Sequence, residues 1–217
     1  RVRIPRPVMW RCGLARDYDG ANDNINFGAS TTIGDYVSKT LSCYLTFDSV
    51  AADEIIWVKQ RFNNVCGLQF GLAAAGVSFR QNWSGGQGVW NWVTSFGVPV
   101  VGQVYHLVFT YNGGSTANDP ALWIDGITKA TVETLPPIGT LTADATLNLL
   151  TGENDLGTND FDGRIGCLSY DDAVWSDEEI NRSRWWGRPF GGLQVYHPLW
   201  SDKLINEGSA TANGTAT

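Results

Sequence analysis

Apolar and polar residues alternate along most of the chain, and this alternation is the clearest structural signal in the sequence. Such alternation over about four to eight residues, rich in β-branched and aromatic side chains, predicts a strand with one apolar face. Clusters of Gly, Asn, Asp, Ser and Pro separate these stretches and are typical of turns. The strands predicted in this way are 40–49, 76–83, 88–95, 104–111, 120–126 and 163–170.

The spacing of these strands and turns predicts an all-β fold in which two antiparallel sheets pack face to face as one sandwich. One helix is expected near the end of this region. Ser176 precedes an acidic run and Glu179 lies three residues later, which is the arrangement of a capping box. The helix is predicted over 177–186, because Gly187 and Pro189 would end it.

The segment 76–95 predicts a hairpin whose tryptophans have two alternative orientations. Trp90 and Trp92 fall on one face of the second strand, and Asn91 falls on the other. In one interpretation both indole rings point into the core. In the other they form an exposed platform for a sugar, because pyranoses offer a C–H face to rings and hydroxyl groups to amides. The candidate glycan-binding residues of this second interpretation are Trp83, Trp90, Trp92, Asn82 and Asn91, with Gln81 and Gln87 nearby.

The composition of the chain argues against several kinds of partner and site. The chain has 217 residues and a formal net charge of −7, which argues against nucleic acid, because phosphate backbones are bound by basic surfaces. The longest apolar region, 93–111, is interrupted by Gly, Pro, Gln and His, so we interpret it as two strands and not as a membrane span. The cysteines contain no C-x-x-C pair, which argues against a zinc knuckle and leaves disulfides and buried thiols open.

Four motifs in a fixed order resemble the laminin G-like jelly-roll branch of the concanavalin A-like lectin/glucanase superfamily. They are "YDGANDN" at 18–24, "YHLVFTY" at 105–111, "LWIDG" at 122–126, and the stretch 163–180 from "GRIGCLSY" into the helix. The resemblance implies a two-sheet antiparallel jelly-roll sandwich with one short C-terminal helix. It departs from the usual motif at Gly166 and Cys167, where the branch has an acidic pair, and this weakens any role of those carboxylates.

The ends of the chain carry a second resemblance. Residues 193–217 are similar to segments found beside laminin G-like domains in tailed-phage structural proteins. The predicted organisation is an N-terminal arm at 1–11, a jelly-roll domain at 12–186 and a C-terminal extension at 187–217. The extension either folds back on its own sandwich or reaches a neighbouring subunit, and Pro198 restricts its strand to an edge. The resemblance implies a virion. In the second alternative, both arms would bind other virion subunits.

Hydrolase chemistry has little support in the sequence. The glucanases of the superfamily place three carboxylates along one strand, as a retaining mechanism requires. The nearest pattern here is Glu153 and Asp155, which lacks the third carboxylate and lies in a loop-like region. His106 lies on a predicted strand and is interpreted as a core or edge histidine, and no G-x-S-x-G elbow is present. We therefore predict that the protein is not an enzyme.

The loop at 152–163 is a candidate calcium site. Oxygen ligands at this density suit calcium, and the loop resembles the calcium loop of pentraxins. The candidate ligands are Glu153, Asn154, Asp155 and Asp160. Asp19 and Asp23 would join them if the opening turn folded over this loop. The alternative is a solvated acidic loop that binds no metal.

Two functions remain from different classes. The first is a non-catalytic structural or adhesion protein of a virion surface, with cell-surface glycans as further ligands. The second is a calcium-dependent glycan-binding module of a larger secreted protein, with an extracellular location. A glucanase is the third and weakest alternative, for the reasons given above.

Overall fold

The structure is a computed structural model that describes residues 15–29, 37–51, 53–61, 65–73, 76–153, 159–186, 195–197 and 215–216. It contains one helix and many short strands in this part of the chain. The elements are β1 (Arg16–Asp19), β2 (Ile25–Asn26), β3 (Ser38–Phe47), β4 (Ile55–Arg61), β5 (Val65–Ala73), β6 (Gly76–Trp83), β7 (Gly86–Asn91), β8 (Tyr105–Asn112), β9 (Ala121–Ile124), β10 (Ile127–Lys129), β11 (Val132–Leu135), β12 (Asn148–Thr151), β13 (Asp162–Asp171), α1 (Asp177–Trp186), β14 (Val195–His197) and β15 (Thr215–Ala216).

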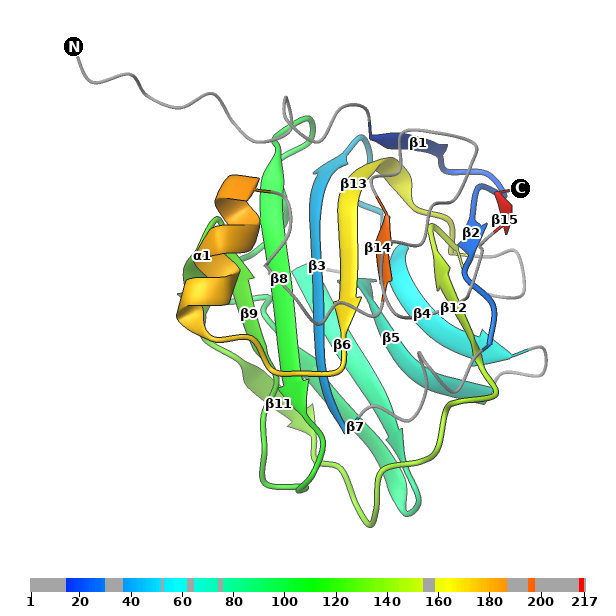
Figure 1. The fold of residues 1–217 in the computed structure, drawn as a ribbon, viewed down its shortest axis with the longest axis vertical. Helices are drawn as coiled ribbons and strands as arrows, with labels where there is room; N and C mark the ends of the chain where they lie inside the picture. Colours follow the sequence, from blue (N-terminus) through cyan, green and yellow to red (C-terminus); the bar gives the residue numbers. More distant parts are fainter. Residues whose placement is uncertain are drawn as a thin grey trace.

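The strands form two antiparallel sheets that lie one behind the other (Figure 1). The sheet nearer the viewer, called the front sheet, has the order β1-β13-β3-β8-β9-β10 in the described residues, and β14 also pairs with β13. The sheet behind it, called the rear sheet, has the order β11-β7-β6-β5-β4-β12-β2-β15. This confirms the predicted fold, a two-sheet jelly-roll sandwich with one short helix.

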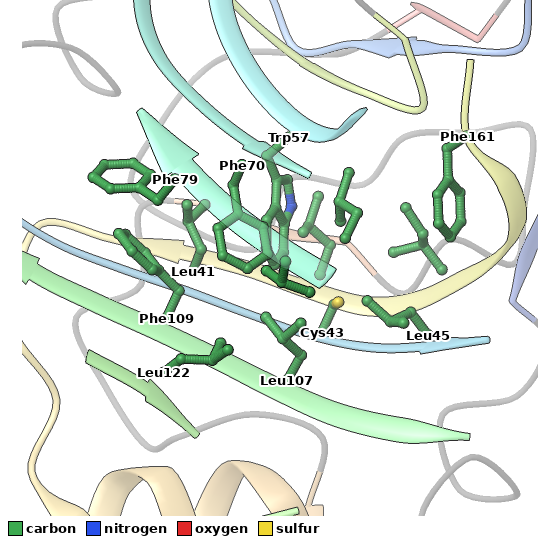
Figure 2. Packing of buried hydrophobic residues seen from close by; sticks show 14 of the residues in the cluster. Leu41, Cys43, Leu45, Trp57, Phe70, Phe79, Leu107, Phe109, Leu122 and Phe161 are labelled. Carbon is green, nitrogen blue, oxygen red and sulfur yellow. The ribbon is translucent and has the colours of Figure 1, made fainter. Parts of the chain in front are cut away.

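The core lies between the inner faces of the two sheets (Figure 2). Leu41, Cys43 and Leu45 project from β3 of the front sheet, and they meet side chains of the rear sheet such as Trp57 and Phe70. Aromatic rings contact one another across the layers. The ring centroids of Phe79 and Phe109, for example, lie 4.3 Å apart. Each such buried side chain contributes roughly 1.5–3 kcal/mol of hydrophobic stabilisation, so this core holds the two sheets together.

Helix α1 begins where the capping box predicts. The Ser176 hydroxyl donates to Glu179 Oε2 at 2.8 Å, and the backbone NH of Ser176 donates to the same carboxylate at 2.7 Å. The helix then packs on the outer face of the front sheet, where Ile180 and Trp175 are buried against Val108 of β8. The outer face of the front sheet is therefore partly covered, as Figure 1 shows beside β8 and β9.

The described parts of the C-terminal extension pair with strands of the sandwich in their own chain. Strand β14 pairs with β13 of the front sheet, and β15 pairs with β2 of the rear sheet. These two pairings are those expected of an extension that folds back on its own sandwich. The N-terminal arm predicted at 1–11 lies outside the described residues.

Two cysteines have described states. Cys43 is a free thiol within the core, and burial raises its pKa. Cys167 is disulfide-bonded, and its partner cysteine lies outside the residues whose side chains are described. Among the described residues, the structure contains no helix with the length and apolar character needed to cross a membrane.

Candidate functional site

The hairpin β6–β7 presents a polar face to solvent. Its strands pair with Ser78 opposite Asn91, Arg80 opposite Val89, and Asn82 opposite Gln87. Directly opposed residues of an antiparallel pair point to the same side, and these residues are partly exposed while their sequence neighbours are buried. We call this set, on the outer face of the rear sheet, the outer strip. Its members are Ser78, Arg80, Asn82, Gln87 and Asn91.

The tryptophans of this hairpin lie on the opposite, inner face. Trp90 and Trp92 are 0% exposed, and Trp83 is 6% exposed. The indole NH of Trp90 donates to Asp119 Oδ1 at 2.8 Å, and that of Trp92 donates to Thr131 Oγ1 at 3.1 Å. The predicted aromatic platform is therefore wrong, because buried rings cannot stack on a sugar from solvent. The structure agrees with the alternative interpretation, in which these rings fill the core.

The amides predicted near the platform divide between the two faces. Asn82, Asn91 and Gln87 lie on the outer strip. Gln81 is buried instead, where it accepts a hydrogen bond from Lys39 Nζ at 2.8 Å and donates to the Gly67 carbonyl at 2.6 Å. The structure therefore brings together two of the five predicted glycan-binding residues at the surface, Asn82 and Asn91, with Gln87 beside them.

The outer strip retains unused hydrogen-bonding groups. The Gln87 amide nitrogen donates to Asn82 Oδ1 at 3.3 Å, and Asn91 Oδ1 accepts from the Val93 backbone NH at 3.3 Å. Asn82 Nδ2, Asn91 Nδ2 and Gln87 Oε1 have no hydrogen-bond partner among the described residues. An amide offers two donors and an acceptor with two lone pairs, so the strip can donate to and accept from hydroxyl groups.

Aliphatic side chains border the outer strip. Val89 lies between Gln87 and Asn91 on β7 and is partly exposed. On the neighbouring edge strand β11, Val132 pairs with Asn91 and Leu135 pairs with Val89, and these two side chains are 39% and 48% exposed. The face therefore combines polar groups with an apolar border, a combination that suits ligands with both hydroxyl groups and C–H surfaces.

A second group of polar residues forms where the opening turn meets the loop after β12. We call it the acidic cluster, and its members are Asp23, Asn24, Glu153 and Asp160. The Asn24 side-chain amide donates to Glu153 Oε1, and Asp23 pairs with Arg16 at 3.0 Å. Asp19 lies nearby on β1, where its carboxylate accepts the Ala21 backbone NH at 3.0 Å. The opening turn does fold against this loop, which the sequence alone did not establish.

Within the acidic cluster, Glu153 has an environment that disfavours its charged form. Burial raises the pKa of Glu153, and the nearby Asp160 and Asp23 raise it further. Glu153 Oε2 and Asp160 Oδ1 are buried and have no hydrogen-bond partner in the described part of the chain. No set of three acidic, His or Cys side chains with metal-binding geometry occurs within the described residues. The predicted ligands Asn154 and Asp155 lie outside those residues.

Gly152 sets the position of Glu153 in this cluster. Its φ of +92° lies in the region that favours glycine. A Cβ atom at this position would lie 2.3 Å from the Tyr18 ring and 2.5 Å from the Asp23 carbonyl oxygen. Only glycine therefore lets the loop approach the opening turn so closely.

His106 is a buried structural residue beneath α1. Its Nε2 lies 3.1 Å from Ser183 Oγ of the helix and 3.4 Å from Ser42 Oγ of β3. Burial, together with the nearby positive charge of Arg184, lowers the pKa of His106 to about 3. Its side chain has no carboxylate partner among the described residues, so these serines and this imidazole do not form a catalytic triad. The interpretation of His106 as a core histidine agrees with this environment.

The fold and the sequence identify the class of protein. A family model of laminin G type, described as the concanavalin A-like lectin/glucanases superfamily, matches residues 19–181. The chain belongs to this superfamily, which confirms the resemblance carried by the four sequence motifs. No curated protein sequence matches the chain significantly.

Several solved structures share the fold at low sequence identity. A Bacteroides ovatus protein described as carbohydrate binding has a TM-score of 0.65 and 14% identity, and the match covers 94% of this chain but 57% of that one. A pentraxin from Limulus polyphemus has a TM-score of 0.57 and 12% identity, with 93% and 90% of the two chains covered. Domain 4 of an extracellular arabinanase from Geobacillus stearothermophilus, in complex with arabinotriose, has a TM-score of 0.52 and 16% identity, with 78% and 76% covered.

Proposed function

We propose that the protein is a non-catalytic carbohydrate-binding module whose glycan binds to the outer strip. The observation that carries this proposal is the juxtaposition of Asn82, Gln87 and Asn91 on one partly exposed sheet face, with amide groups beside Val89 that have no partner among the described residues. Amides would exchange hydrogen bonds with sugar hydroxyls while the aliphatic side chains contact the C–H face of the ring.

The similar structures support this proposal. One of them is described as carbohydrate binding, and another was solved with arabinotriose bound. Both share the fold of this chain, and the chain spans 57% of the length of the Bacteroides ovatus structure. A role within a longer protein is therefore part of the proposal, as the prediction of a glycan-binding module in a larger secreted protein already implied.

A non-catalytic role fits the arrangement of the carboxylates. A glycosidase needs two carboxyl groups, about 5–9 Å apart, that flank the scissile bond of the bound sugar. The outer strip itself contains no carboxylate among its members. We therefore assign to the strip the binding of a sugar and not its hydrolysis.

The proposal can be tested by measuring the affinity of the protein for a panel of soluble oligosaccharides. The double variant Asn82→Ala/Asn91→Ala should lose binding at least about ten-fold, because each lost hydrogen bond contributes about 1 kcal/mol. Asn181→Ala is the matched control, because Asn181 is exposed on α1 and its side chain makes no hydrogen bond with the described residues. Binding that is unchanged in the double variant, or no binding across the panel, would reject the proposal.

A calcium ion at the acidic cluster is a second proposal, carried by two buried carboxylate oxygens that have no hydrogen-bond partner among the described residues. Glu153 and Asp160 would supply hard oxygen ligands, and a cation would offset the repulsion between them. The ion would also stabilise the contact between the opening turn and the loop. Asn154 and Asp155, which the sequence predicts as further ligands, belong to the same loop.

Thermal unfolding of chelator-treated protein tests the calcium proposal. Millimolar calcium should raise the Tm, because a ligand that binds only the native state stabilises it by mass action. Glu153→Gln should abolish this increase, whereas Glu178→Gln, on exposed helix α1, should leave it intact. An unchanged Tm of the wild-type protein, or an equal increase in the Glu153 variant, would contradict the proposal.

A structural or adhesion role on a virion remains a prediction from the C-terminal extension. None of the similar structures named above is a virion protein, so they give no support to the tailed-phage similarity. The disulfide at Cys167 is consistent with either a virion surface or another extracellular setting. Deletion of 187–217 should abolish assembly but preserve the fold if the extension docks on other subunits. Loss of the fold itself would instead assign the extension to its own sandwich.

A further inference from the structure

Arg80 occupies the centre of the outer strip. It lies in the middle of β6, opposite Gln69 of β5 on one side and Val89 of β7 on the other. Ser78 and Asn82 flank it on its own strand and share its partly exposed face. Its guanidinium group therefore sits among neutral polar side chains on three adjacent strands.

Arg80 has no partner for its charge within the part of the chain that the structure describes. Among the arginines with described side chains, Arg16, Arg164 and Arg182 pair with carboxylates, and Arg184 lies over the Trp185 ring. Arg80 makes no hydrogen bond and no ion pair with any described residue. The chain has more acidic than basic residues and a formal net charge of −7, so carboxylates are not scarce in this protein.

The described outward positions around Arg80 hold no acidic side chain. The outward positions of β5, β6 and β7 that the structure describes hold Gln69, Gly71, Ala73, Ser78, Arg80, Asn82, Gln87, Val89 and Asn91. A partly buried guanidinium with unused donors is a site for an external anion, because charge-assisted hydrogen bonds are stronger than neutral ones.

We propose that the outer strip recognises an acidic sugar through a carboxylate held by Arg80, an inference that rests on the proposed carbohydrate-binding function. The planar fork of a guanidinium matches a carboxylate in a bidentate arrangement. Asn82, Gln87 and Asn91 exchange hydrogen bonds with the hydroxyl groups of the same ligand, and Val89 contacts its ring. The ligand class is an oligosaccharide that contains uronic acid residues.

A single arginine matches one carboxylate at a time and not the closely spaced phosphates of a nucleic acid. Nucleic acids present a row of phosphates, and their affinity grows with the number of cations that neutralise them. The outer strip has one cation, Arg80, in a protein with a net negative charge. A uronate places one carboxylate on a ring whose other groups are hydroxyls, which fits one arginine surrounded by amides.

Trigalacturonate and its methyl ester test this inference, because esterification removes the negative charge of each carboxyl group and leaves the sugar rings and their hydroxyl groups unchanged. The wild-type protein should bind trigalacturonate about ten-fold or more tightly than the ester, as expected for charge-assisted hydrogen bonds. Added salt should weaken the binding of the acid more than that of the ester. Arg80→Gln should lose the preference for the acid, and Arg182→Gln, which removes the same charge from exposed helix α1, should keep it.

The outcomes separate this inference from the proposed function. If the protein binds neutral oligosaccharides and the ester as well as it binds the acid, the uronate inference is wrong but the carbohydrate-binding function stands. A preference for dextran sulfate over trigalacturonate that depends on Arg80 would replace the carboxylate by a sulfate and overturn the inference as stated. A failure to bind any neutral or acidic oligosaccharide would overturn both.

Discussion

At the scale of single residues, the contact between the opening turn and the loop after β12 depends on a glycine, Gly152, which has no side chain. Gly152 brings the loop backbone against the Tyr18 ring and the Asp23 carbonyl. The Tyr18 hydroxyl lies 2.8 Å from Thr151 Oγ1 and fixes the ring beside it. The sequence "YDGANDN" therefore acts together with Gly152, although the two segments are far apart in the chain.

We predict that Gly152→Ala destabilises the protein by about 3 kcal/mol or more, because it adds a steric clash to an unfavourable backbone conformation. Chemical denaturation of the purified variant measures this loss. Gly102→Ala is the control, since Gly102 has a similar φ of +74° with nothing within 4 Å of the added Cβ, and it should cost about 1 kcal/mol. An equal loss of unfolding free energy in the two variants would show that the close approach at Gly152 does not contribute to stability.

His106 predicts a pH dependence of stability. Its pKa is lowered to about 3 in the folded protein, whereas an unfolded chain has the ordinary value near 6.5. Between these values the unfolded state binds more protons, so the free energy of unfolding falls as pH falls below about 6.5. At pH 5 the protonation of His106 should lower the free energy of unfolding by about 2 kcal/mol relative to neutral pH.

A His106→Gln variant isolates this contribution, since other titrating groups remain the same. The free energy of unfolding, measured between pH 7.5 and 4.5, should fall more steeply in the wild-type protein than in the variant. Parallel profiles would mean that His106 becomes protonated without cost in the folded state, contrary to its burial.

Individual site residues were only partly predictable from the sequence. Alternation placed Trp90 and Asn91 on opposite faces of β7, but it could not say which face meets the core. Arg80 was missed because nothing in the sequence indicates that an arginine lacks a partner. Its spacing from Asn82 could have identified it, because residues two positions apart on a strand lie on the same face.

At the scale of elements, α1 shows how local sequence and packing agree. The capping box of Ser176 and Glu179 starts the helix, and Ile180 and Trp175 attach it to β8 of the front sheet. Short helices owe most of their stability to the packing of one apolar side. The attachment of α1 therefore depends more on Ile180 than on the cap.

We predict that Ile180→Ala lowers the free energy of unfolding by about 2–4 kcal/mol, as expected for a buried side chain that leaves a cavity. Ile127→Ala provides the matched comparison, because Ile127 on β10 is 63% exposed, and it should change stability by less than about 0.5 kcal/mol. Denaturation curves of both variants give the two values. A loss at Ile180 no larger than that at Ile127 would contradict the packing described for α1.

Two of the strands that the sequence did not predict, β4 and β11, lack a single apolar face. In β4, Ile55 and Val58 pack with Leu150 in a cluster separate from the core, while Trp57 points into the core, so both faces are apolar. In β11 all four residues are exposed, so no apolar face marks it as a strand. The predicted strand 88–95 ends early at Asn91, because the Trp92 carbonyl accepts the Phe96 backbone NH in a turn.

At the scale of the whole molecule, the two outer faces of the sandwich differ. Helix α1 covers part of the front sheet, whereas the outer strip on the rear sheet is partly open to solvent. The four sequence motifs sufficed to predict the sandwich and its family. They could not locate the proposed binding face, because which face is open follows from where the helix packs in three dimensions.

The central claim, that a glycan binds to the outer strip, is tested most directly by NMR. Arabinotriose and trigalacturonate would be titrated into isotope-labelled protein while the side-chain amide signals of Asn82, Gln87 and Asn91 are followed. We predict that at least one of these oligosaccharides shifts all three signals saturably and leaves Asn181 on α1 unchanged. Shifts confined to Asn24 in the acidic cluster or to Asn181, or no shift with either oligosaccharide, would contradict the claim.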